Sequence, residues 1–116
     1  MGYTVRLENE KGELVSLDCQ VVEIGSQGDM LHPFDAEMVI TFNLRTHFKS
    51  VFPGGLHDLY GKKANDCINA LAAAVLMLKD DFDGNPWSTN EGNARYYLES
   101  LLNWAREKPD AIFKVY

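Results

Sequence analysis

The spacing of the apolar residues changes once along this chain, and that change limits the folds that the chain can adopt. Up to about residue 48, apolar and polar residues alternate, which is typical of strands with one buried face. From about residue 62, apolar residues recur every three or four positions, which is typical of amphipathic helices. Strands in one half and helices in the other predict an α+β fold, in which helices cover one face of an antiparallel sheet.

Three strands are expected in the first half, near Tyr3–Glu8, Leu14–Ile24 and Glu37–Phe48. Turn-forming residues at 9–12 join the first two, and a glycine-rich loop at 25–29 follows the second. Because these connections are short, we expect a three-stranded antiparallel meander. The alternation of residues 111–115 predicts a possible fourth short strand at the C-terminus, at a sheet edge.

Two helices are expected to cover the sheet, near Lys62–Phe82 and Thr89–Lys108. Ser88 and Glu91 have the spacing of a capping box at the start of the second helix, whereas Gly92 weakens its first turn. The 116 residues form one α+β domain, 1–116, of ordinary size. The expected core consists of the inward-facing residues of both layers: Val5, Leu17, Ile40, Phe42, Ile68, Leu71, Val75, Leu98 and Leu101.

The charge of the chain argues against two classes of partner. Seventeen acidic residues outnumber eleven basic ones and give a net charge of −6. Nucleic acids and anionic membranes are both bound through Lys and Arg, so neither is an expected partner. No secretory signal is expected at the N-terminus, and Cys19 and Cys67 are expected to be reduced thiols in the core. These features predict a cytoplasmic protein.

Known motifs for cofactors and metals fail at specific positions. A phosphate loop before the first helix would need Gly where Leu56 stands and Ser or Thr where Lys63 stands. A calcium loop around the aspartates at 80–83 would place Lys79 and Asn90 at the first and twelfth ligand positions. The three histidines lack the spacing of a zinc site. We therefore expect no cofactor, no metal and no enzymatic activity.

The remaining features favour a non-catalytic acidic protein that binds a protein with a basic surface. Nucleases need a basic cleft, and an acidic partner associates with such a cleft quickly and blocks it. The concrete expectation is an immunity protein or inhibitor that neutralises a toxin or nuclease, as bacterial and phage accessory proteins do. One alternative is an assembly subunit that self-associates through a sheet edge. Another is an enzyme with a scattered loop site that uses His57, Asp58 or Tyr60.

The expected partner-binding residues are Asp80, Asp81, Asp83 and Trp87. The three aspartates are the most concentrated charge in the chain, and Trp87 follows them closely and supplies an apolar anchor. Such an acidic corner is also typical of ordinary solvated surface. If the aspartates bind, neutralising all three is expected to slow association and to leave the stability of the fold almost unchanged.

Overall fold

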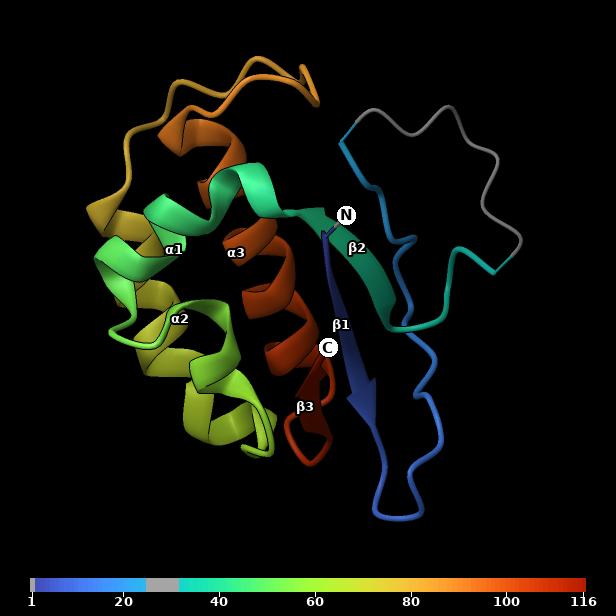
Figure 1. Cartoon of the computed structure of the whole chain (residues 1–116). Coiled ribbons are helices and arrows are strands. Elements are labelled where there is room, and N and C mark those ends of the chain that lie inside the picture. The colour runs from blue at the N-terminus through green and yellow to red at the C-terminus, as the bar shows by residue number, and fades with distance from the viewer. Residues whose placement is uncertain (1, 25–31) are drawn as a thin grey trace.

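The computed structural model describes residues 2–24 and 32–116. Its centre is a three-stranded antiparallel sheet in the order β2-β1-β3, and its helices cover one face of that sheet (Figure 1). The expected α+β class is confirmed. The strands are β1 (Gly2–Glu8), β2 (Glu37–Thr41) and β3 (Ile112–Val115), and the helices are α1 (Arg45–Val51), α2 (Ala64–Met77) and α3 (Glu91–Glu107), with 3-10 helices η1 (Phe42–Leu44) and η2 (Gly55–Leu59).

The alternation predicted for the first strand is confirmed in β1. Tyr3, Val5 and Leu7 are buried on the covered face of the sheet. Val5 lies opposite Met38 of β2, and Leu7 lies opposite Phe113 of β3, so both neighbouring strands bury their side chains on the same face. The possible fourth strand of the sequence is thus the third strand of the sheet.

The two expected helices form with narrower bounds, as α2 and α3. Figure 1 places α3 between α2 and the sheet. This position explains why α3 buries residues on more than one side, including Tyr97, Leu101 and Trp104. A helix buried on several sides fixes the place of the loop that leads into it.

The expectation that the third strand runs to Phe48 is wrong. The strand ends at Thr41, whose hydroxyl accepts a hydrogen bond of 3.2 Å from the N–H of Asn43 and caps η1. The buried residues Leu44, Phe48 and Phe52 then follow at intervals of four, which is helical spacing. Extending the alternation of the preceding residues to Phe48 misses this helical spacing.

The expected strand Leu14–Ile24 is also absent from the sheet. Isolated bridges occur at Leu14 and Ser16, and the N–H of Leu17 donates to the carbonyl of Phe34. The described part of this segment nevertheless forms no continuous strand. Cys19 is exposed here, which corrects its expected place in the core, whereas Cys67 is buried as expected. The alternation of residues 14–24 predicts a buried face, but it does not specify a neighbouring strand with which the segment could pair. The expected loop at 25–29 lies outside the described residues.

Most of the expected core is buried, and two members are only partly so. Phe42 leaves the sheet with η1 and packs edge-on against Tyr3, with ring centroids 4.8 Å apart. Ile68 lies at the margin of the core on α2. Both exceptions reflect where an element turns, which its apolar spacing does not specify.

Both outer edges of the sheet make hydrogen bonds to other parts of the chain. On β3, Phe113 N–H donates to Lys62 O at 3.0 Å, and Gly61 N–H donates to Phe113 O at 2.8 Å. On β2, Val39 N–H donates to the Glu23 carboxylate at 2.8 Å. These hydrogen bonds occupy backbone groups at which another strand could pair with either edge.

Candidate functional site

All four expected partner-binding residues lie in one loop, residues 78–90, which we call the α2–α3 loop. It arches over the end at which α3 begins (Figure 1). Asp80, Asp81, Asp83 and Trp87 are all exposed. Their placement therefore depends on how tightly the loop is held to the helix below it.

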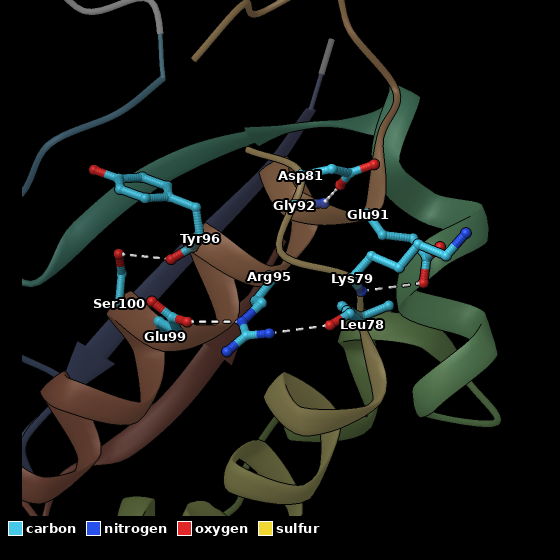
Figure 2. A network of polar contacts seen from close by, with 9 residues as sticks. All are labelled: Leu78, Lys79, Asp81, Glu91, Gly92, Arg95, Tyr96, Glu99 and Ser100. Carbon is cyan, nitrogen blue, oxygen red and sulfur yellow. Dashed lines mark hydrogen bonds and ion pairs between the residues drawn. The ribbon is translucent and has the colours of Figure 1, made fainter. Parts of the chain in front are cut away.

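The first part of the loop is fastened to α3 by polar contacts (Figure 2). Asp81 Oδ1 accepts a hydrogen bond of 2.6 Å from the N–H of Gly92, in the first turn of the helix. Arg95 donates to the carbonyl of Leu78 at 3.2 Å and pairs with Glu99 at 2.9 Å. The carboxylate of Asp81 thus satisfies a helix N–H that has no partner within the helix.

Gly92 is needed because the loop backbone crosses directly against it. A Cβ atom at this position would lie 2.0 Å from the backbone nitrogen of Phe82 and 2.4 Å from the carbonyl carbon of Asp81. The sequence suggested only that Gly92 weakens the first turn. The structure shows that it permits the close approach of loop and helix.

The second part of the loop is organised around the buried side chain of Asn93. Its Oδ1 accepts from the N–H of Asp83 at 3.4 Å. Its Nδ2 donates to Asp83 Oδ1 at 3.2 Å, Asn85 O at 3.0 Å and Ser88 O at 3.3 Å. A buried amide with these partners holds the loop in one shape.

Asp83 takes part in the same network from the solvent side. The Ser88 hydroxyl donates to its carboxylate at 2.7 Å, and the N–H of Asn85 donates at 2.9 Å. These hydrogen bonds, that of Ser88 first, hold the pKa of Asp83 below its ordinary value. Because that pKa is lowered, the contribution of Asp83 to the loop is present at neutral pH and is lost as the pH falls through it.

The predicted capping box at Ser88 is wrong. The N-cap of α3 is Asn90, whose side chain accepts a hydrogen bond of 2.8 Å from the N–H of Asn93. Ser88 donates to Asp83 instead, and Glu91 accepts from the N–H of Lys79 at 3.4 Å. Asn is as good a cap as Ser, so the neighbouring loop contacts decide between them.

The three aspartates therefore differ in their contacts. Asp81 and Asp83 hold the loop, whereas Asp80 makes none of the hydrogen bonds or ion pairs found among the described residues. The expectation that all three could be neutralised without structural effect conflicts with the contacts of Asp81 and Asp83. Trp87 is 82% exposed, and its backbone N–H donates a hydrogen bond of 3.0 Å to Asn85 Oδ1.

We expect Asp81→Ala to lower the free energy of unfolding by on the order of 1 kcal/mol, as loss of a helix cap does. Asp80→Ala, which removes the same charge one residue away, serves as the control and is expected to leave stability within about 0.5 kcal/mol. Urea unfolding of both variants measures the difference. Equal stability of the two variants would contradict the capping role of Asp81.

Trp87 also forms one wall of a pocket that the sequence did not predict. The pocket has a volume of about 370 Å³ and lies between the loop, β2 and residues 23 and 24. Glu23 and Val39 line it opposite the loop, and Tyr97 of α3 lines it as well. Glu23 is far from Trp87 in sequence, and only the break of alternation at residues 22–24 marks its segment as unusual.

The residues of the alternative enzyme site lie on or beside η2, and each has a contact of its own. The His57 ring packs edge-on against Tyr3, with centroids 5.4 Å apart. Asp58 accepts from the N–H of Gly54 at 2.9 Å, and Tyr60 packs against the C-terminal tyrosine, with centroids 6.1 Å apart. Each side chain has its own packing or turn-forming contact.

Within residues 2–24 and 32–116, no three or more His, Cys, Asp or Glu side chains are grouped so that they could hold a metal ion. No helix in the described part of the chain has the length and apolar character needed to cross a membrane.

Comparisons with models of known protein families, with curated proteins and with solved structures gave no match to this chain.

Proposed function

We propose that this chain is a non-catalytic acidic protein that binds a basic protein through the surface around Trp87. The observation that carries the proposal is the exposure of this tryptophan, 82%, on a loop that is fastened to α3 at several points. Tryptophan is among the commonest anchors of protein interfaces, and a fixed loop loses little conformational freedom on binding.

The charge supports the choice of partner. The net charge is −6, and Asp80, Asp81 and Asp83 are exposed in the same loop as Trp87. The lowered pKa of Asp83 keeps its carboxylate charged at neutral pH, so Asp83 attracts a basic surface while it holds the loop. We propose a cytoplasmic immunity protein or inhibitor that covers the basic cleft of a toxin or nuclease.

Trp87→Ala is expected to weaken binding to such a partner at least tenfold, or by about 1.4 kcal/mol, because it removes the apolar anchor. Leu76→Ala is the matched control, since Leu76 is 80% exposed on α2 and lies outside both the loop and the pocket lined by Trp87. The partner is first captured on the immobilised chain from the native host at low salt and identified by mass spectrometry. Binding of the purified partner to both variants is then measured by surface plasmon resonance.

The proposal predicts that the captured partner is basic and that its association slows as salt is raised. A captured protein without a basic surface would contradict the proposal. So would equal affinity of the partner for Trp87→Ala and the wild-type chain.

A further inference from the structure

The pocket beside Trp87, which we call the Trp87 pocket, combines apolar walls with one carboxylate. Trp87 and Pro86 line it from the α2–α3 loop, and Val39 lines it from β2. Glu23 also lines the pocket, from the stretch of chain at residues 22–24. A pocket of about 370 Å³ is large enough for one long side chain but small for a folded segment.

Within residues 2–24 and 32–116, the Glu23 carboxylate accepts one hydrogen bond and forms no ion pair. One oxygen accepts the 2.8 Å hydrogen bond from the N–H of Val39. The ion pairs formed among the described residues use Glu8, Glu37, Asp110 and Glu99, and none of them includes Glu23. Glu23 is half-buried, so its charge is less well hydrated than that of an exposed carboxylate.

The neighbouring Tyr97 hydroxyl responds to this charge. Burial raises the pKa of Tyr97, the hydrogen bond from the N–H of Ile24 opposes the rise, and the nearby charge of Glu23 adds to it. The hydroxyl accepts that hydrogen bond at 3.1 Å and remains protonated at neutral pH. Among the described residues that line the pocket, Glu23 is the one charged side chain and the others are neutral.

A carboxylate and an indole ring in one pocket suit a particular chemical group. The face of an indole ring attracts cations, and a carboxylate pairs with a guanidinium or an ammonium group. Arginine fits best, because its flat guanidinium group stacks on a ring while donating to a carboxylate.

We propose that the Trp87 pocket receives an arginine side chain of the basic protein partner, held by the Glu23 carboxylate and the Trp87 ring. This inference rests on the proposed function and adds a specific contact to it. It also adds to the interface a charged residue, Glu23, that lies outside the cluster of aspartates at 80–83.

The probe for this inference is arginine amide, with citrulline amide as its neutral isostere. Arginine amide is expected to shift the indole N–H resonance of Trp87 in a saturable way, with a dissociation constant in the millimolar range that suits one side chain. Citrulline amide is expected to bind at least tenfold more weakly. Trp87→Phe assigns the resonance, because the only other indole is that of the buried Trp104.

Glu23→Gln is expected to weaken binding of arginine amide at least tenfold. The variant keeps an oxygen for the N–H of Val39, so the strand edge is preserved, and the same spectra report whether the fold is intact. Glu10→Gln is the matched control, since it removes one exposed carboxylate from the turn at residues 9–12. This variant is expected to bind arginine amide as the wild-type chain does. Equal binding of arginine and citrulline amides, or unchanged binding by Glu23→Gln, would overturn the inference.

The same variants separate this inference from the proposed function. If a basic partner binds Glu23→Gln as tightly as the wild-type chain but loses affinity for Trp87→Ala, the arginine pocket is wrong and the proposed function stands. If arginine amide binds through Glu23 but no basic protein binds the chain, the occupant is not a protein side chain, and both proposals fail in their choice of partner.

Discussion

Phe113→Ala is expected to lower the free energy of unfolding by about 3–5 kcal/mol, the usual cost of removing a fully buried phenylalanine ring. Phe113 is 0% exposed and lies opposite Leu7 in the sheet. Its backbone also bonds to residues 61 and 62, so the surrounding chain is fixed and cannot easily collapse into the cavity.

Phe42→Ala is the matched control. Phe42 is only partly buried, at the edge of Tyr3, and its loss is expected to cost clearly less. Urea unfolding followed by circular dichroism gives both values. A cost for Phe42→Ala equal to or above that for Phe113→Ala would contradict the placement of β3 in the core.

Gly92→Ala is expected to lower the free energy of unfolding by about 1–3 kcal/mol, the usual cost of forcing an added group into a packed site. Helix propensity alone predicts the opposite sign, a gain of up to about 1 kcal/mol. The added methyl group would meet backbone atoms of Asp81 and Phe82, which are not free to rotate away.

Asn69→Ala provides the comparison for helix propensity. Asn69 is exposed within α2, so its replacement is expected to leave stability unchanged or to raise it by a few tenths of a kcal/mol. Thermal unfolding of both variants measures the two signs. A stabilising Gly92→Ala would mean that the loop does not cross the helix as described.

The candidate site was predictable in part. The composition of residues 80–87 marks a charged loop with a tryptophan, and the structure places that tryptophan at the surface. The sequence did not predict which aspartates hold the loop, because their contacts depend on Gly92 and Asn93 lying under the loop. Glu23 joins the site only after the chain has folded back beside β2.

The sequence by itself determined the α+β class, β1, the two long helices and the C-terminal strand. Each of these has an apolar period that a local segment carries within its own residues. Tertiary structure decided that the C-terminal strand forms a ladder with β1 whereas residues 14–24 form only isolated bridges, and that helices occur within residues 42–52. It also decided which residues surround Trp87, because pairing and close approach join segments that are distant in sequence, and apolar spacing specifies a buried face without specifying its neighbour.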